Sequence, residues 1–523
     1  MRFLFFLISL IFLISYPLSA QTVIGIVFED KNENSLLDQG EKGLPNISVS
    51  NGTQVVQTDK KGRYELPIDD DDIIFVIKPR DDRPPVDSLN LPQFFYLHKP
   101  NGSPELEYPG VAPTGELPLS VNFPLISAAE PDSFKMLYFG DPQTPTTETV
   151  SFFTRSIVRE LIGVEGYMLG LTLGDIVGDD LSLFHPINEA VAKIGIPWYN
   201  IYGNHDMNLD APHDSLADET FEWIYGPANY SFNYGKVHFV VLDDVMFPRP
   251  DGKPSYVGGL HQWQLDFLEN DLKYVPKDYL VVIHMHIPIF LQAFYGETFR
   301  KADRDRLFEL LKDFPHNLSL SAHSHQQQHF FYGKEDGWLQ EKAHHHFTVG
   351  TTCGDWWCGE LDAEGIPEST MRDGTPKGYL IMDFNGNSYS YEYKAYGKPA
   401  NYKMRLYAPM AVRQGNRTTG ELIVNFFQGH EKDKVSYRID GGEWKKMNRF
   451  ETTDPYMSTI QYKWDHTLNP PEGRRPSNPV NSKHIWKTRL ATNLSIGLHT
   501  IEVKAEDFLG RTYFDKTTYR IVK

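Results

Sequence analysis

The alternation of apolar and polar positions divides the chain into three regions. Between residues 132 and 396, continuous apolar runs such as M-L-G-L-T-L and Y-L-V-V-I-H alternate with segments whose apolar residues recur every three or four positions. Continuous runs of this length are typical of strands buried on both faces. The region is therefore expected to be α/β, with helices covering its sheets. The periodic spacing predicts helices over residues 147–162, 181–194, 261–275 and 303–313.

The regions on either side have a different pattern. Residues 21–126 and 401–523 consist of short β-prone runs, among them V-I-G-I-V-F and G-E-L-I-V-N-F-F, separated by turns rich in Asn, Gly and Asp. Short strands with frequent turn signals are typical of all-β domains. We predict one small β-sandwich domain before the α/β domain and a second one after it.

The first 20 residues have the features of an export signal. Arg2 is followed by an apolar stretch of about 14 residues, which ends in P-L-S-A before Gln21. This order is typical of a secretory signal peptide, cleaved here after Ala20. A transmembrane anchor is the alternative, but the stretch is shorter than the ~20 residues that a spanning helix needs. We expect an exported protein, periplasmic or extracellular, with no transmembrane anchor after cleavage.

The overall charge limits the classes of partner. The chain has 51 Lys and Arg residues against 69 Asp and Glu residues, a formal net charge of −18. This balance argues against a nucleic-acid-binding protein that works through a basic surface. An anionic substrate would be repelled by the protein as a whole, so its binding needs metal ions or a local cluster of cations.

Only two cysteines occur in the chain, Cys353 and Cys358. In an exported protein they are able to form a disulfide. The loop between them is so short that the bond would add only about 2 kcal/mol of stability. Two free thiols are the alternative, and two cysteines alone make a poor zinc site.

A polar loop in the first region has the oxygen spacing of a calcium loop. Ser35 stands where such loops usually have glycine, and no helices are predicted on either side. The loop also resembles the start of β-sandwich repeats in bacterial surface adhesins. A structural Ca²⁺ is one interpretation, and a polar turn without metal is the other. The residues at positions 1, 3, 5, 9 and 12 of the loop are Asp30, Asn32, Asn34, Asp38 and Glu41.

Residues that can bind metals follow five successive predicted strands. An acid at the end of a buried strand is costly unless a cation compensates its charge. Ligands of open sheets bind at the carboxyl ends of strands, where these residues would meet. Imidazole, carboxylate and amide groups without cysteine suit ions of borderline hardness. The residues are Asp141 with Gln143, Asp175, Asn204 with His205 and Asp206, His284 with His286, and His323 with His325.

In these motifs the chain resembles the calcineurin-like metallophosphoesterase family. It contains D-P-Q, G-D-I-V, G-N-H-D, H-M-H-I-P and A-H-S-H in the order of the family signature, within residues 132–396. The flanking domains, with D-G-T-P-K-G-Y and S-K-H-I-W-K, resemble an exported bacterial subgroup. The resemblance implies a four-layer αββα sandwich core and a metal-dependent hydrolase of phosphoric esters, either a phosphomonoesterase or a phosphodiesterase.

The resemblance also implies two metal ions, such as Mn, Fe or Zn, that hold a hydroxide for in-line attack on phosphorus. His286 is preferred as a ligand to His284, which is expected to be structural, because the family's ligand stands two residues before a proline. His205 would stand near the leaving-group oxygen, with Asp206 orienting it. Asp141, Gln143 and His325 would bind one ion, Asn204, His286 and His323 would bind the other, and Asp175 would bridge the two.

The chain departs from the family pattern at two positions. Gln143 replaces a histidine, and Ala322 replaces a glycine before His323. An amide oxygen is a weaker ligand than imidazole, so we expect weaker binding at the first metal position or a preference for a harder ion. The alternative is a non-catalytic surface binding or adhesion protein with a vestigial phosphoesterase domain.

Substrate specificity is expected to lie in the loops around this site. Trp356 and Trp357 are candidates for a wall beside the leaving group, Asp355 for a contact with it, and Asp373 and Lys377 for the rim of the site. The alternatives are core tryptophans and a simple turn. The substrate class is a small phosphorylated molecule, such as a phosphosugar or a phospholipid head group.

Overall fold

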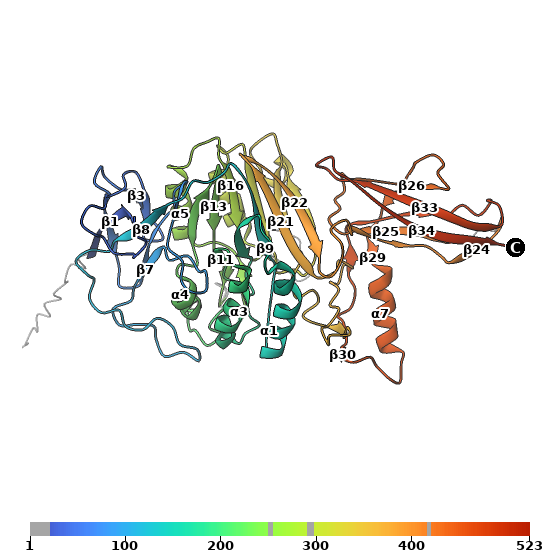
Figure 1. Ribbon diagram of the computed structural model, residues 1–523, viewed down its shortest axis with the longest axis horizontal. Coiled ribbons are helices and arrows are strands. Elements are labelled where there is room, and N and C mark those ends of the chain that lie inside the picture. Colours follow the sequence, from blue (N-terminus) through green and yellow to red (C-terminus); the bar gives the residue numbers. More distant parts are fainter. Residues whose placement is uncertain (1–20, 249–254, 290–297, 416–419) are drawn as a thin grey trace, which may run out of the picture.

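The computed structural model describes residues 21–248, 255–289, 298–415 and 420–523. The predicted signal peptide, residues 1–20, lies outside the described residues. The chain forms three parts in a row, from the N-terminal sheets through a central α/β part to an elongated C-terminal part (Figure 1). Within the described ranges, no helix is long and apolar enough to cross a membrane.

The N-terminal part is built from two four-stranded sheets, in which Val27 and Val49 are buried, while Phe75 packs against Phe267 of the central part. One sheet has the order β4 (Arg63–Ile68), β1 (Gln21–Glu29), β8 (Phe123–Ser127), β6 (Asp82–Arg83), and the other has the order β3 (Val55–Gln57), β2 (Ser48–Ser50), β5 (Asp72–Val76), β7 (Phe95–His98).

The central part contains two larger mixed sheets. The short strands β14 (Val245–Met246) and β15 (Val257–Gly258) form a separate antiparallel pair. The five-stranded sheet has the order β11 (Trp198–Asn200), β10 (Tyr167–Thr172), β9 (Ser133–Phe139), β21 (Gly378–Asn385), β22 (Ser388–Ala395), and the six-stranded sheet has the order β12 (Tyr230–Tyr234), β13 (Val237–Val241), β16 (Leu280–His284), β17 (Asn317–Ser321), β19 (His344–Thr348), β18 (Gln328–Tyr332).

All four predicted helices are present, with shifted ends. The first begins after the capping residue Thr146 and contains a π-helical turn. A further short helix, α4 (Glu219–Tyr225), was not predicted, and single turns occur at η4 (Asp214–Leu216) and η5 (Lys334–Asp336). The predicted helices are α1–η1–α2 (Thr147–Phe153, Thr154–Val158, Arg159–Leu161), η2–α3–η3 (Leu181–Leu183, Phe184–Val191, Ala192–Ile194), α5 (Gln262–Leu272) and α6 (Lys301–Leu310).

The two central sheets pack face to face between two layers of helices. Tyr138 of β9 and Phe239 of β13 belong to one buried cluster that joins the sheets. The other face of β9, with Phe139, packs against Phe153 and the helices around it, while α5 and α6 cover the six-stranded sheet. The central part is therefore a four-layer αββα sandwich, as predicted.

The direction of the strands brings the predicted site residues together. Strands β9, β10 and β11 run parallel, and so do β13, β16, β17 and β19. The loops after these strands therefore leave the two sheets at the same edge, where ligands of such sheets bind. These loops carry the polar residues on which the sequence prediction depends.

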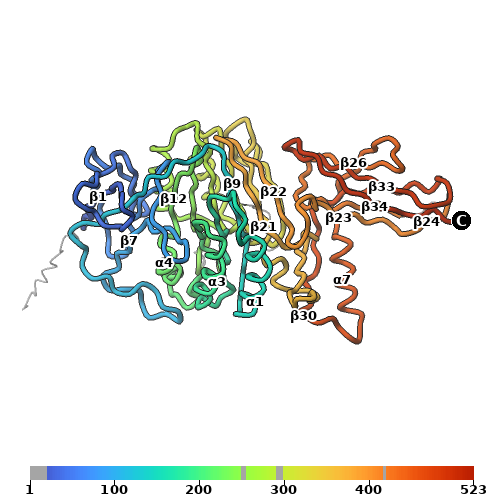
Figure 2. Tube along the Cα trace, viewed as in Figure 1, coloured from blue at the N-terminus to red at the C-terminus, as the bar shows by residue number. Residues whose placement is uncertain are grey.

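The C-terminal part contains two sheets and one helix, α7 (Pro455–Asp465), which was not predicted. The C-terminus of the chain lies at the end of this part that is farthest from the N-terminal sheets (Figure 2). The small pair of β29 (Thr452–Thr453) and β31 (Asn481–Ser482) completes it, and β30 (Gly473–Arg474) pairs with β20 (Gly359–Glu360) of the central part. The sheets have the orders β23 (Met404–Tyr407), β25 (Glu421–Phe426), β32 (Ile485–Arg489), β28 (Asn448–Arg449) and β24 (Ala411–Arg413), β34 (Thr512–Val522), β33 (Gly497–Glu506), β26 (Lys434–Ile439), β27 (Lys445–Lys446).

Candidate metal centre

The backbone at the centre is strained in a way that is typical of functional sites. Five of the seven predicted metal ligands have positive φ angles, a region that residues other than glycine seldom adopt. Each such residue costs of the order of 1–3 kcal/mol and persists only where its surroundings hold it. The five residues and their φ angles are Asp141 (34°), Gln143 (36°), Asp175 (47°), His323 (63°) and His325 (49°).

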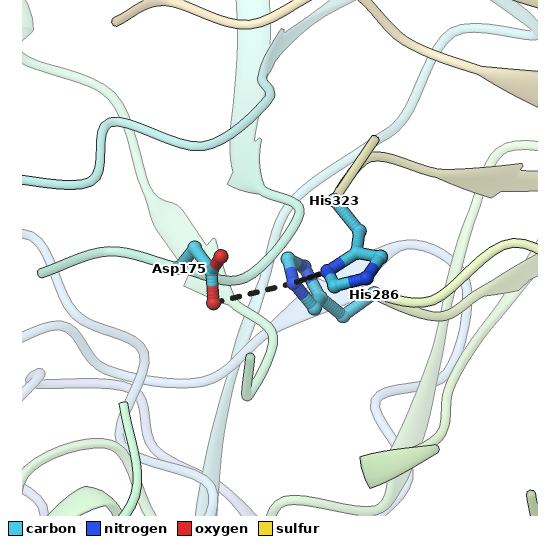
Figure 3. A group of neighbouring side chains, drawn as sticks. All are labelled: Asp175, His286 and His323. Carbon is cyan, nitrogen blue, oxygen red and sulfur yellow. Dashed lines mark hydrogen bonds and ion pairs between the residues drawn. The ribbon is translucent and has the colours of Figure 1, made fainter. Parts of the chain in front are cut away.

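Three side chains form the middle of the centre. Asp175, His286 and His323 each present one possible ligand atom, and these atoms lie within 4.8 Å of one another. The Nε2 atom of His286 is 3.2 Å from Asp175 Oδ1 and 3.2 Å from His323 Nδ1 (Figure 3). The other ring nitrogen of His286 lies 2.8 Å from the carbonyl of Leu173, which turns Nε2 toward the centre. Two imidazole nitrogens facing each other beside a carboxylate form a suitable environment for a cation.

Three further predicted ligands surround this group. Asn204 Oδ1 lies 3.1 Å from His286 Nε2. The carboxylate of Asp141 lies 3.7 Å from His286 Nδ1 on one side and 3.4 Å from His325 Nε2 on the other. Nδ1 of His325 faces the carbonyl of Gly354 at 2.8 Å, so that its Nε2 also faces the centre.

Gln143, the predicted ligand that departs from the family pattern, also lies at the centre. Its main-chain NH donates to the carbonyl of Asp175 at 2.8 Å, and its side chain is buried. Two buried oxygens among the described residues here, Gln143 Oε1 and Asp141 Oδ2, make no hydrogen bond. A buried oxygen without a hydrogen bond carries a desolvation penalty, which a bound cation would remove. The donor set of carboxylates, imidazoles and amide oxygens therefore fits metal ions.

Buried carboxylates and imidazoles shift one another's pKa values at the centre. Burial raises the pKa of Asp141 to about 7 and lowers the pKa of His323 to about 3 and of His325 to about 4. Burial also opposes the charged form of His286, but Asp175 and Asp141 raise its pKa to about 10. A cation would favour ionised carboxylates and neutral imidazoles, because it supplies the positive charge that His286 supplies in this structure.

Comparison with known proteins identifies the family. Residues 135–327 match the model of the calcineurin-like phosphoesterase family, residues 31–108 match the N-terminal part of calcineurin-like phosphoesterases, and residues 346–513 match the C-terminal part. The chain belongs to the calcineurin-like phosphoesterase family. It is therefore a hydrolase that acts on phosphoric ester bonds, as its motifs predicted, and its family implies metal ions.

Two relatives of this phosphoesterase have named activities. It is 25% identical over 201 residues to the 3′,5′-cyclic adenosine monophosphate phosphodiesterase CpdA of Escherichia coli, which covers 37% of this chain and 69% of CpdA. It is 28% identical over 137 residues to the serine/threonine-protein phosphatase CPPED1 of Pongo abelii, covering 25% of this chain and 42% of that protein.

The comparison with solved structures gives distant matches. One is a purple acid phosphatase from yellow lupin, with 12% identity, a TM-score of 0.37, and coverage of 68% of this chain and 69% of that chain. Another is a dimetal phosphatase from Danio rerio, with 14% identity, a TM-score of 0.32, and coverage of 49% of this chain and 98% of that chain.

His205 of the phosphoesterase lies at the edge of the centre, and its partner differs from the one predicted. Its Nδ1 is 2.7 Å from Oδ1 of Asp179, and its main-chain NH donates to Asp175. Burial lowers the pKa of His205, but Asp175 and Asp179 raise it to about 9. These contacts hold the imidazole in place and favour its charged form.

The prediction that Asp206 orients His205 is wrong. The carboxylate of Asp206 accepts hydrogen bonds from the main-chain NH groups of Gly203 and Val177 and is fully buried. Asp206 therefore stabilises the turn that carries Asn204 and His205. Asp179 was missed because its approach to His205 depends on how two loops pack, although it stands only four residues after Asp175.

A second missed residue supports the metal centre of the phosphoesterase. Asp244 follows β13 and is fully buried, and its carboxylate accepts the main-chain NH groups of His286 and Ile287 at 3.0 Å. The signal in the sequence is the strand ending H-F-V-V-L-D-D. His284, by contrast, is buried between Tyr138 and Phe239, as expected of a structural histidine.

The residues predicted to contact the substrate divide into two groups. Trp356 is half-buried and stacks on the imidazole of His325, with 4.2 Å between the ring centres. The other four are buried in the protein interior, so their predicted role in contacting the substrate is wrong. Asp355 accepts the NH of Ser477, Trp357 donates to the carbonyl of Pro142, Asp373 accepts the NH of Gln327, and Lys377 donates to the carbonyl of Pro367.

The predicted disulfide is absent, because both cysteines are buried free thiols. The sulfur of Cys353 points toward His325 Nδ1 at 3.6 Å and toward the carbonyl of Gly354. The thiol of Cys358 donates instead to the carbonyl of Trp356. The loop is held by hydrogen bonds of its own main chain, including the NH of Trp357 to the carbonyl of Cys353 at 3.1 Å.

The predicted calcium residues share one loop. The carboxylate of Asp30 accepts the main-chain NH groups of Asn34 and Ser35, and that of Asp38 accepts the side-chain amides of Asn32 and Asn34. Glu41 accepts the NH groups of Lys31 and Asp38. These hydrogen bonds close the loop as a polar turn, and the calcium interpretation stays a prediction.

Proposed function

We propose that this chain hydrolyses phosphoric monoesters or diesters at a centre of two metal ions. The observation that supports it most strongly is the pair of buried oxygens without hydrogen bonds, on Asp141 and Gln143, beside the group of Asp175, His286 and His323. The proposed ligands are Asp141, Gln143 and His325 for one ion, Asn204, His286 and His323 for the other, and Asp175 between them.

Two such ions, for which Mn, Fe and Zn are the candidates, would supply a hydroxide for in-line attack on phosphorus and neutralise charge on the phosphoryl oxygens. The protein's own part is to position these groups and to handle the proton of the leaving group. His205 is suited to that second task, because Asp179 holds its Nδ1 and leaves Nε2 as the remaining donor. A proton donated from Nε2 would neutralise the oxygen that leaves phosphorus.

The class of ester is open to experiment because the two named relatives differ. CpdA acts on a cyclic phosphodiester, and CPPED1 is a phosphatase, by their names. For this chain we propose a small phosphorylated substrate, with phosphosugars and phospholipid head groups as candidates. We also propose that the enzyme is exported, since residues 1–20 have the order of a signal peptide.

The test combines metal analysis with hydrolysis. Purified protein would be assayed with p-nitrophenyl phosphate and with bis(p-nitrophenyl) phosphate after addition of Mn, Fe or Zn. We expect turnover of at least one ester and its loss in Asn204→Ala. Asn387→Ala is the matched control, because Asn387 lies in an exposed turn and donates only to the carbonyl of Asp278.

The opposite outcome would favour another class of protein. Absence of bound metal and of hydrolysis, with Asn204→Ala indistinguishable from wild type, would contradict the proposal. That result would leave the non-catalytic surface binding protein as the better interpretation.

A further inference from the structure

A buried carboxylate, Asp373, joins the central α/β part to the C-terminal part. Only 1% of Asp373 is exposed. One carboxylate oxygen accepts the main-chain NH of Gln327 at 2.8 Å and lies 3.1 Å from Nε2 of His484, and the other accepts the NH of Thr375 at 2.9 Å. An unpaired buried carboxylate would be strongly unfavourable, so these contacts hold its ionised form.

The partner of Asp373 in the C-terminal part is a histidine with both ring nitrogens engaged. His484 Nδ1 lies 2.7 Å from Oδ1 of Asn425. The amide nitrogen of Asn425 donates to the carbonyl of Asp373 and to Asp454, so its oxygen is the acceptor for His484. Both ring nitrogens therefore face hydrogen-bonding oxygens, which fixes the plane of the ring and its direction toward Asp373.

Gln327 connects this network to the metal centre. It stands two residues after His325, and its side-chain amide donates to the carbonyl of Phe427 in the C-terminal part at 2.7 Å. Its side chain is thus held across the contact between the two parts, and its main chain is held by Asp373, which His484 contacts from the C-terminal part. The positive φ angles of His323 and His325 make outside support necessary, because a strained loop relaxes where nothing holds it.

A second loop at the centre has the same support. The carboxylate of Asp355 accepts the main-chain NH of Ser477 at 2.6 Å, and the neighbouring Trp356 stacks on His325. The C-terminal part therefore contacts the loop that carries His325 and also the loop that covers it. Both loops adjoin the imidazole of His325, so both contacts help to position it.

We infer that Asp373 and His484 are positioning residues for the metal centre. By this inference the C-terminal part holds the loop of residues 323–327 in its strained form and thereby sets the affinity of the ion bound by Asp141, Gln143 and His325. The inference rests on the proposed two-metal function. Hydrogen-bonded partners of a metal-binding loop typically change metal affinity by 10- to 100-fold when they are removed.

His484→Phe tests the inference, because phenylalanine keeps a planar ring and removes both ring nitrogens that face Asn425 and Asp373. His499→Phe is the matched control: His499 is also a buried histidine of the C-terminal part, and it pairs with Asp440, which is not part of this network. Metal-free protein would be titrated with Mn²⁺ in a calorimeter, and hydrogen–deuterium exchange would be measured over residues 321–328.

We expect His484→Phe to weaken one of two Mn²⁺ sites by at least about tenfold, with faster exchange over residues 321–328. Excess Mn²⁺ should restore kcat, and His484→Gln, which keeps an amide donor toward Asp373, should restore part of the affinity. His499→Phe should change none of these. The same Mn²⁺ affinities and the same exchange in both histidine variants would overturn the inference.

A substitute variant and the wild-type titration cover the remaining outcomes. If His484→Phe does not fold, Asp373→Asn replaces it, since asparagine keeps the size of the side chain and removes its charge. Wild-type protein that binds no Mn²⁺ would contradict the proposed function, whereas wild-type protein with two sites and unchanged variants would contradict only the positioning role.

Discussion

The pairing of His205 with Asp179 predicts a measurable loss of catalysis in Asp179→Asn. His205 Nδ1 and Asp179 Oδ1 are 2.7 Å apart, and the exposed fraction is 32% for the side chain of His205 and 50% for that of Asp179. A charge-assisted hydrogen bond is worth roughly 1.5–3 kcal/mol, but solvent screening at this exposure reduces the value toward about 1 kcal/mol. A loss of about 1–1.5 kcal/mol in the transition state corresponds to a decrease in kcat of roughly tenfold.

The assay should vary the leaving group. Because His205 is proposed to donate a proton to the departing oxygen, the loss in Asp179→Asn should be larger for phenyl phosphate than for p-nitrophenyl phosphate, whose leaving group needs less protonation. Asp180→Asn is the matched control, since it removes the same charge one residue away, where the side chain binds Ser182 instead of His205. Equal rates for Asp179→Asn and Asp180→Asn, or the same loss for both leaving groups, would refute the reasoning.

Three further predictions concern stability. Lys78→Met leaves its buried partner Glu130 unpaired and should lower the free energy of unfolding, measured with urea, by about 3–5 kcal/mol. Adding Glu130→Gln to Lys78→Met should recover part of this loss, and a loss under about 1 kcal/mol in Lys78→Met would contradict the prediction. Burial raises the pKa of Asp433 to about 7, so the wild type loses stability as pH rises from about 4 through 7. Asp433→Asn lacks this ionisation, so its free energy of unfolding should exceed that of wild type by about 1–2 kcal/mol at pH 8 and equal it at pH 4. Since Cys353 and Cys358 are free thiols, a reducing agent should leave Tm unchanged, whereas a fall of several degrees would show a disulfide.

The parts of the fold that the sequence predicted have strong periodic patterns. The long central helices and the doubly buried strands follow directly from hydrophobic spacing, and the order of motifs was enough for the αββα core. Helix α4 was missed because it has only seven residues. Helix α7 was missed because Met457 is its only buried residue, although the capping Asp454 and Pro455 at its first turn were visible signals.

The site residues that were mispredicted depend on contacts between distant loops. Spacing placed Asp141, Asp175 and His323 at strand ends, which is a local property of the chain. His205 pairs with Asp179 and not with Asp206, and Asp373 is buried under the C-terminal part. Both arrangements depend on how separate elements pack. A single sequence contains no periodic signal for such contacts.

The central claim is that two metal ions bind where these loops meet, and anomalous diffraction from crystals soaked in Mn²⁺ tests it most directly. The account predicts two peaks, roughly 3.5–4 Å apart, with Asp175 between them and Gln143 beside one of them. A single peak away from Asp175, or no peak at the centre in crystals that diffract well, would contradict it.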